Sequence, residues 1–128
     1  MGMELPELAR ELLDRPTFAV LTTINPDGSP QGSVIWAKRD GEEIVFSTIR
    51  GRRKTRNLER DPRVSVVAFD PDDPYRYVEV RGTVAITEAG GDALIDELCR
   101  AYQGRPWPPR PGEVRVVCRL VASHIVAH

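Results

Sequence analysis

The chain has 128 residues, with 18 basic and 19 acidic side chains and a formal net charge of −1. This length predicts one domain over residues 1–128, and the balanced charge excludes a general attraction to nucleic acid or anionic membranes. Residues 1–15 alternate charged residues with leucines, unlike the apolar core of a signal peptide, and no apolar run is long enough to cross a bilayer. We therefore predict a cytoplasmic protein that binds neither nucleic acid nor membrane.

Helical and strand patterns alternate along the first half of the chain. Leucines at positions 5, 8 and 12 form a helical stripe, which the proline at position 16 ends. Apolar, β-favouring segments follow, separated by the turn signals Asn-Pro-Asp-Gly and Asp-Gly. The expected elements are a helix over 4–14 and strands over 18–24, 31–39 and 44–48.

The second half adds further strands, two helices and a proline-rich loop. The expected elements are a helix over 53–60, strands over 64–69 and 75–87, a helix over 88–103 and a strand over 114–121 that residues 125–127 extend. Residues 70–74 form an acidic loop, and residues 104–112 form a loop that contains four prolines. Gly82 lies inside a strand and predicts a bulge or bend. Six strands with few helices predict an α+β fold, mainly β with flanking helices, built as an antiparallel barrel.

Several expected strands are apolar on both faces. Val64 and Val66 alternate with Val67 and Phe69, which point to the opposite face, and residues 34–36 are consecutively apolar. A strand with two apolar faces needs cover outside the barrel as well as inside it. A second copy of the chain would supply that cover, so we predict a homodimer.

The most distinctive stretch is a strand that runs into a basic helix. Residues 50–60, which we call the basic segment, contain six basic residues and one acid. Ser47 and Thr48 end the preceding strand, and Gly51 allows a tight turn. Hydroxyl groups, helix amides and cations in this order predict an oxyanion site. The alternative is a solvated helix face or a nucleic-acid patch.

Other chemistry-bearing residues form no convincing site. His124 and His128 lie near the end of a strand without a third ligand, and the acidic residues 70–73 fit no calcium pattern. Cys99 and Cys118 are predicted to be buried thiols and not a disulfide. No catalytic triad can be assembled. This pattern is typical of an enzyme whose cofactor carries the reaction.

Five stretches of the sequence carry a family resemblance. They are AVLTTINPDGSPQ at 19–31, SVIW at 33–36, FSTIR at 46–50, RKTRNLERDPRV at 53–64 and VRGTV at 80–84. The series resembles the split β-barrel flavin-binding superfamily of pyridoxamine 5′-phosphate oxidase. It is most similar to the small actinobacterial flavin/deazaflavin reductases that use coenzyme F420. The likeness covers residues 18–128, and its most specific part is RKTRNL at 53–58 together with the Asp-Pro pair at 61–62.

The resemblance implies a six-stranded split barrel that forms a homodimer with two cofactor sites at the interface. It assigns Ser47 and Thr48 as donors to the cofactor phosphate, with Arg53 and Lys54 as its charged partners. The residues implied to pack the ring and its side chain are Gln31, Ser33, Val34, Ile35 and Trp36. Tyr75 and Tyr77 are implied to cover the ring from the partner subunit.

Two features bear on the activity that the resemblance implies. The chain ends in VASHIVAH and lacks the substrate-binding tail of true pyridoxamine phosphate oxidases, so oxidation of pyridoxamine phosphate is not expected. Arg50, Arg52 and Arg56 exceed what one phosphate requires and would suit the acidic tail of F420. FMN is the alternative cofactor.

The resulting prediction is an F420-dependent oxidoreductase. It would pass a hydride from reduced F420 to a small or planar conjugated acceptor, whose identity the sequence leaves open. The alternatives are an FMN-dependent oxidoreductase on the same fold, a non-catalytic flavin-binding protein and a nucleic-acid-binding module. No metal ion is predicted.

Overall fold

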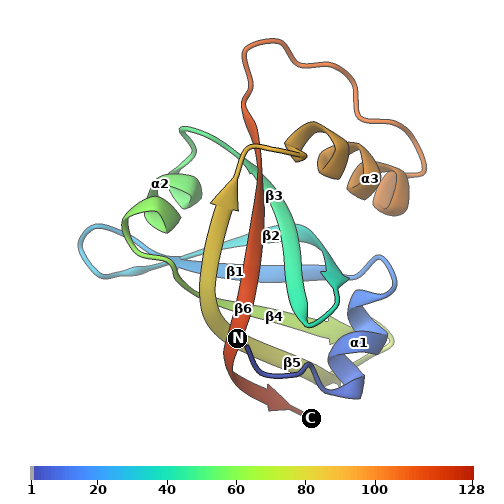
Figure 1. Cartoon of the computed structure of the whole chain (residues 1–128). Helices are drawn as coiled ribbons and strands as arrows, with labels where there is room; N and C mark the ends of the chain where they lie inside the picture. The colour runs from blue at the N-terminus through green and yellow to red at the C-terminus, as the bar shows by residue number, and fades with distance from the viewer. Residues whose placement is uncertain (1) are drawn as a thin grey trace.

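The structure, a computed structural model, describes residues 2–128 as a closed antiparallel barrel with three helices (Figure 1). Around the barrel the strands follow the order β1–β2–β3–β6–β5–β4. The elements are α1 (Glu7–Leu13), β1 (Phe18–Ile24), β2 (Pro30–Asp40), β3 (Glu43–Ile49), α2 (Arg53–Arg60), β4 (Arg63–Asp70), β5 (Asp73–Thr87), α3 (Gly91–Gln103) and β6 (Arg115–Ala127). The predicted fold class and number of strands are confirmed.

Several predicted boundaries differ from those in the structure by one or more residues, and three of these differences have a clear structural cause. The first helix begins at Glu7 instead of residue 4, because Pro6 stands in extended geometry before it. The third helix begins at Gly91 instead of residue 88, because Gly90 has a left-handed φ of 85°. The predicted acidic loop over 70–74 is a tighter turn, since Asp70 pairs with Asp73 and β5 already begins there.

The barrel interior is filled by alternate side chains of all six strands. Leu21, Phe46, Val66, Val80 and Leu120 are each no more than 1% exposed. This alternation arises because successive strand residues point to opposite faces. Two of the helices complete this core with leucines. Leu12 of α1 and Leu58 of α2 belong to the same buried cluster as the strand residues.

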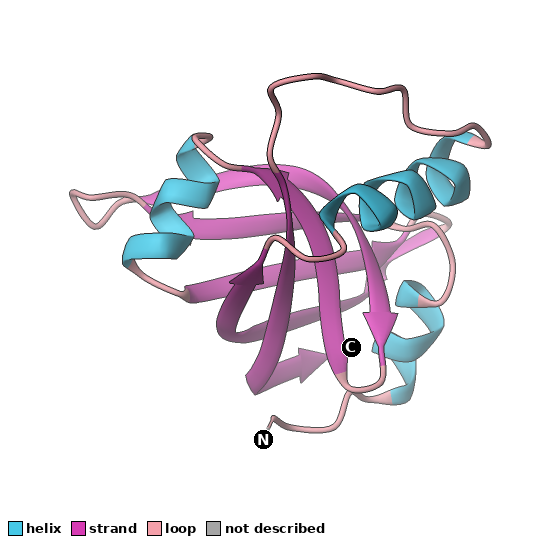
Figure 2. Cartoon of the chain, turned by 45° about the horizontal axis from the view of Figure 1, so that its top comes forward, coloured by secondary structure: helices cyan, strands magenta, loops and turns pink. Residues whose placement is uncertain are grey.

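The third helix, α3, packs against the outside of the barrel. Leu94 and Leu98 contact Val45 of β3 and Val117 of β6 in a second buried cluster. A long connection over residues 104–114 then leads from α3 back to β6 (Figure 2). The outer faces of β3 and β6 are therefore covered by the chain's own helix.

The outer faces of β1, β2 and β4 carry exposed apolar side chains instead. Phe18 is 54% exposed, Val20 38%, Val34 64% and Phe69 39%. We call these four residues the apolar face. Val20 pairs with Val34 on one side and with Val67 on the other, so apolar side chains run across three strands. Patches of this kind typically mark a surface that binds another molecule.

No helix within residues 2–128 combines the length and the apolar character that a membrane crossing requires.

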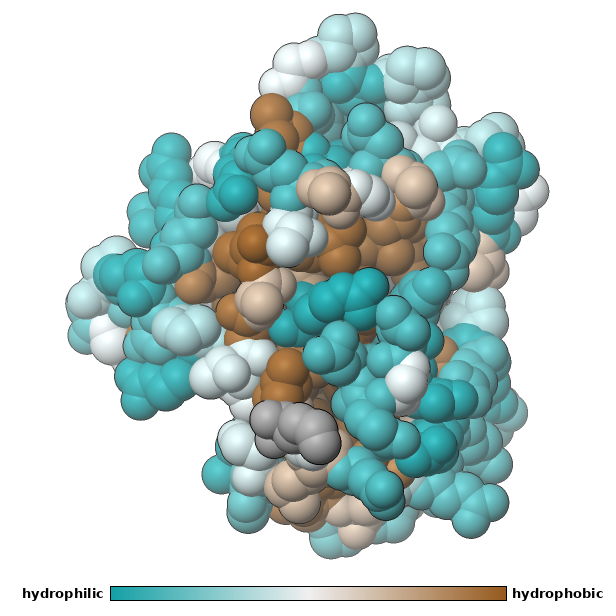
Figure 3. All heavy atoms as spheres, in the orientation of Figure 1, coloured by the Kyte–Doolittle hydropathy of each residue, from teal (hydrophilic) through white to brown (hydrophobic). Residues whose placement is uncertain are grey.

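On the face seen in Figure 1, hydrophobic side chains gather across the region between α2 and α3, with hydrophilic side chains around them (Figure 3).

Candidate functional site

Helix α2 is fixed to the barrel by polar side chains that point inward. The Thr55 hydroxyl donates to the Ile49 carbonyl at 2.6 Å and lies 3.0 Å from the Thr48 hydroxyl. The Asn57 amide donates to Thr23 Oγ1 and to Asn25 Oδ1, both at 3.0 Å. Thr55 and Asn57 are fully buried. These bonds set the position of the helix start, and with it the position of Lys54.

A cavity of about 180 Å³ lies where α2, the outer face of β2 and β3, and α3 meet. We call it the anion cavity. Its lining residues are Val34, Ile35, Trp36, Ser47, Arg52, Lys54, Ile95, Leu98, Trp107 and Arg115. The set contains three cations and one hydroxyl but no carboxylate. A cavity lined in this way is complementary to a phosphate or another oxyanion.

Lys54 is the half-buried cation of this cavity. Burial lowers the pKa of the Lys54 ammonium from its ordinary value, and the charge of Arg52 lowers that pKa further. No ion pair involving Arg52 or Lys54 occurs among the residues that the structure describes. A bound anion would relieve this repulsion, so the electrostatics favour an anionic ligand.

Arg115 is the charged residue of the cavity that sequence reasoning missed. It lies in β6, far along the chain from the basic segment, and the pairing of β3 with β6 brings it opposite Ile49. Its Nη1 lies 3.5 Å from Ser47 Oγ. A charged residue between the valines at 114 and 116 was the one available signal, because a cation in an apolar strand needs a specific partner.

The predicted phosphate donors and partners do not all reach the cavity. Thr48 faces the barrel interior and is bonded to Thr55, so of the two predicted hydroxyls only Ser47 lines the cavity. Arg53 is exposed and does not line the cavity. Arg50 contacts Glu59 at 2.7 Å and Glu88 at 3.3 Å. Of the basic segment, the structure therefore places Arg52 and Lys54 in the cavity.

The residues predicted to pack the ring are partly brought together. Val34, Ile35 and Trp36 line the cavity. Gln31 lies outside it and accepts a hydrogen bond from the Thr23 hydroxyl at 2.9 Å. Ser33 also lies outside the lining, and its buried hydroxyl has no partner among the described residues.

The two predicted tyrosines lie on β5, away from the cavity of their own chain. Tyr75 is 85% exposed. Tyr77 stacks on His128, with 4.6 Å between the ring centroids. Their assigned role in covering the ring of another subunit stays a prediction.

Aromatic rings form one wall of the anion cavity. Trp36 stacks on Tyr102 of α3 with centroids 5.5 Å apart and an angle of 15°. Trp107, from the loop after α3, meets Trp36 edge-on at 6.3 Å. This wall offers flat apolar surface beside the cations, which suits a ligand that carries both a planar ring and an anion.

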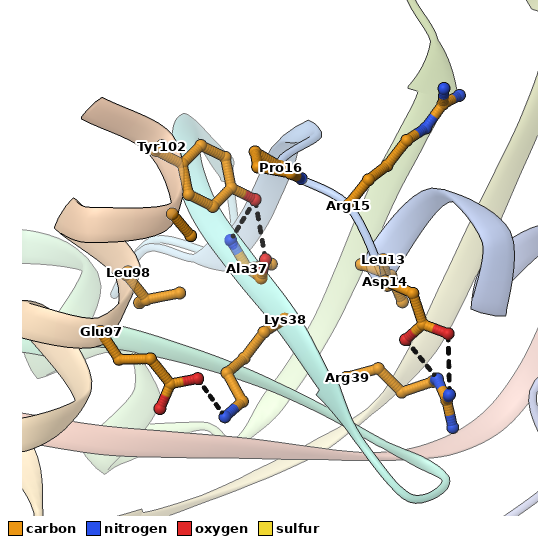
Figure 4. A pocket seen from close by; sticks show the side chains of 11 residues that line it. Leu13, Asp14, Arg15, Pro16, Ala37, Lys38, Arg39, Glu97, Leu98 and Tyr102 are labelled. Atoms are coloured by element: carbon orange, nitrogen blue, oxygen red, sulfur yellow. Dashed lines mark hydrogen bonds and ion pairs between the residues drawn. The ribbon is translucent and has the colours of Figure 1, made fainter. Parts of the chain in front are cut away.

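In a neighbouring pocket, the cationic side chains are paired with carboxylates of the same chain (Figure 4). Lys38 contacts Glu97 at 2.6 Å, and Arg39 forms a bidentate ion pair with the Asp14 carboxylate, with distances of 2.8 and 2.9 Å. The Tyr102 hydroxyl accepts from the Ala37 N–H at 3.0 Å. Because carboxylates already neutralise its cations, this pocket would attract an anion much more weakly than the anion cavity would.

No group of three His, Cys, Asp or Glu side chains within residues 2–128 could hold a metal ion. Cys99 and Cys118 are both buried and free, as predicted.

The fold and the site together describe an antiparallel barrel that carries a cation-lined cavity on its outer wall, as expected of a barrel that binds an anionic ligand there. Comparison with known proteins identifies the family within that class. The model of the family described as "Pyridoxamine 5'-phosphate oxidase" matches residues 5–121, so the chain belongs to this family of oxidoreductases. The resemblance stated from the sequence is confirmed.

Two curated relatives and one solved structure illustrate the likeness. The pyridoxine/pyridoxamine 5′-phosphate oxidase of Rubrobacter xylanophilus is 35% identical over 114 residues, which cover 88% of this chain and 52% of that protein. The enzyme of the same name from Aeromonas hydrophila is 37% identical over 81 residues, covering 62% and 38%. The chain thus spans about half the length of the first relative and 38% of the length of the second. A structure described as an F420 reductase superposes with a TM-score of 0.85 at 35% identity, covering 95% of this chain and 98% of that one.

Proposed function

We propose that this protein is an F420-dependent reductase that acts on a small or planar conjugated acceptor. The observation that carries the proposal is the anion cavity, in which three cations and the Ser47 hydroxyl face an apolar aromatic wall. The likeness to an F420 reductase over nearly the full length of both chains supports it. Reduced F420 would supply a hydride, and the acceptor would take that hydride and one proton.

The chain's own residues would bind and orient the cofactor. Lys54 and Arg52 would neutralise its phosphate, and Ser47 would donate a hydrogen bond to it. Val34 and Trp36 would pack against the ring and keep water from its reacting carbon. The residues of the cavity fit this group, because no carboxylate of the lining would repel the phosphate.

We further propose that the protein works as a homodimer. Val34 lines the cavity and is also part of the apolar face, with 64% of it exposed. A second copy seated on the apolar face would therefore also close the open side of the cavity. Tyr75 of the partner subunit would be available to cover the ring, as the family resemblance implies.

FMN remains the second candidate cofactor, and one observation favours it. The acidic tail of F420 was expected to contact Arg50, but Glu59 and Glu88 already neutralise that side chain. Arg52 and Arg56, which enter no ion pair among the described residues, are left for the tail. A ligand with a single terminal phosphate, such as FMN, would need only the cavity itself.

Titration of the purified protein with each cofactor tests the proposal. We expect F420 fluorescence to change on binding, with an affinity higher than that of FMN at low salt. The difference should shrink as salt rises, because exposed arginines interact weakly and are screened. Equal or tighter binding of FMN at low salt would replace F420 by FMN, and binding of neither would end the assignment as a flavin or deazaflavin enzyme.

A further inference from the structure

We infer that Arg115 is a ligand-binding residue of the anion cavity, where its guanidinium contacts the oxyanion and sets how tightly it is held. The inference rests on the proposed function, because it adds a third cation to the same site. The ligand class is a phosphate monoester or diester.

Arg115 is a buried cation whose hydrogen-bonding capacity is almost unused. Its side chain is only 8% exposed. A guanidinium has five N–H donors. The one hydrogen bond found for them is the 3.5 Å contact with Ser47 Oγ, and Nε is buried without any partner among residues 2–128. Buried polar groups in proteins are nearly always hydrogen-bonded. We therefore expect a bound ligand to supply the acceptors for these N–H groups.

The nearest carboxylate does not satisfy Arg115. Glu113 Oε2 lies 3.7 Å from Nη2, which is too long for a hydrogen bond, and that oxygen is itself buried without a partner. Burial lowers the pKa of the Arg115 guanidinium from its usual value; Glu113 opposes this effect, whereas Arg52 and Arg110 add to it. Extra negative charge at this point would stabilise the group.

Trp107 holds the guanidinium in place without using its donors. The Arg115 Cζ lies 4.7 Å from the centre of the Trp107 ring, within the range of a cation–π contact. Arg110 lies 4.6 Å from the same ring. The Trp107 backbone N–H donates to Asp96 Oδ1 of α3 at 2.9 Å, which fixes the loop against the helix. Stacking therefore orients the guanidinium and leaves its N–H groups free for a ligand.

Arg119, four residues further along β6, shows the contrast. Its Nη1 contacts Asp40 at 2.8 Å and Glu43 at 3.2 Å, and its side chain is 41% exposed. Arg119 is thus a satisfied surface cation on the same strand and serves as a matched control for Arg115.

Binding of inorganic phosphate, FMN and F420 to the wild type, Arg115→Gln, Arg115→Lys and Arg119→Gln tests the inference. We expect Arg115→Gln to weaken each phosphate-bearing ligand about 10- to 100-fold, the range for one charge-assisted hydrogen bond. Arg115→Lys should fall between, because lysine keeps the charge but loses the planar fork and the stacking. Arg119→Gln should stay within about twofold of the wild type.

Thermal unfolding without ligand separates binding from folding. Loss of a buried cation whose nearest carboxylate lies 3.7 Å away should leave the melting temperature of Arg115→Gln unchanged or raise it, while the upward shift caused by FMN or F420 is reduced. Wild-type affinity in folded Arg115→Gln, or an equal loss in Arg119→Gln, would overturn the inference. If Arg115→Gln does not fold, the same comparison is made with Arg115→Lys.

The two proposals can fail separately. Binding of phosphate or FMN that depends on Arg115, without any binding of F420, would reject F420 and keep the inference. Tight F420 binding that is unchanged in Arg115→Gln would keep F420 as the cofactor and reject the inference about Arg115.

Discussion

Two neighbouring cations of α2, Lys54 and Arg53, have different surroundings although the sequence treats them alike. Lys54 lines the anion cavity and is half buried, whereas Arg53 is exposed outside it. We expect Lys54→Ala to weaken cofactor binding by about 1.5–3 kcal/mol, the usual contribution of a hydrogen bond to a charged group. Arg53→Ala, the matched control, should change it by less than about 1 kcal/mol, as for an exposed pair. Fluorescence titration of both variants measures the difference, and equal losses would contradict the assignment of Lys54.

Cys118 is a second residue whose behaviour depends on burial. Burial raises the pKa of its thiol to about 12 from an ordinary value of 9.0, an effect that Lys54 and Arg50 partly oppose. A thiol with a raised pKa in the folded state stabilises the fold fully below its unfolded pKa. That stability is lost as the pH rises from 9 toward 12.

We therefore expect Cys118 to resist iodoacetamide at pH 8 in the folded protein and to react after unfolding in denaturant, since the thiolate is the reactive form. Mass spectrometry of the labelled peptide provides the measurement. Rapid labelling of the native protein at pH 8 would show that the site opens far more readily than its burial indicates.

At the scale of elements, the antiparallel pairing of β5 with β6 depends on a glycine. The register shifts between Arg81 and Gly82, and a Cβ placed on Gly82 would lie 1.9 Å from the Val121 carbonyl oxygen. The predicted bulge is thus confirmed, and the close approach of the Val121 backbone explains it. Gly32 of β2 offers a control, because a Cβ there would have no atom within 4 Å.

Gly82→Ala should destabilise the protein by roughly 1–3 kcal/mol or more, the cost typical of overpacking a well-packed site. Gly32→Ala should be neutral or slightly stabilising, because alanine restricts the unfolded chain. Chemical denaturation of both variants measures the two free energies of unfolding. A wild-type stability for Gly82→Ala would mean that the strands can separate locally without cost.

At the scale of the whole molecule, the apolar face is the surface on which we propose that a second copy of the chain docks. Val20 lies between Val34 and Val67 and is 38% exposed. We expect light scattering at micromolar concentration to give twice the chain mass of 14.3 kDa. Val20→Glu should shift the protein toward monomer, because an interface would bury that carboxylate unpaired.

Val114→Glu is the control for the dimer, since Val114 is 44% exposed but lies in the loop before β6, outside the apolar face. It should keep the mass of the wild type. A wild type that scatters as a monomer would reject the dimer, and dissociation of both variants would show that the apolar face is not the interface.

The local pattern of the sequence determined most of the fold. Alternating apolar residues, the Asn-Pro-Asp-Gly turn and the strand that leads into the basic segment predicted six strands and the helix at residues 53–60, all of which the structure contains. These features were predictable because period-2 alternation and turn chemistry act between neighbours in the chain. The same stretch placed Ser47 and Lys54 at the site, since strand end and helix start are only a few residues apart.

The tertiary structure decided which cations share a cavity. The pairing of β3 with β6 brings Arg115 to the basic segment, and the fold brings Glu59 and Glu88 to Arg50. The sequence alone does not show whether a carboxylate neutralises a given arginine or lysine in the folded chain. The site's charge therefore depends on contacts between distant segments, which exist only once the barrel has closed.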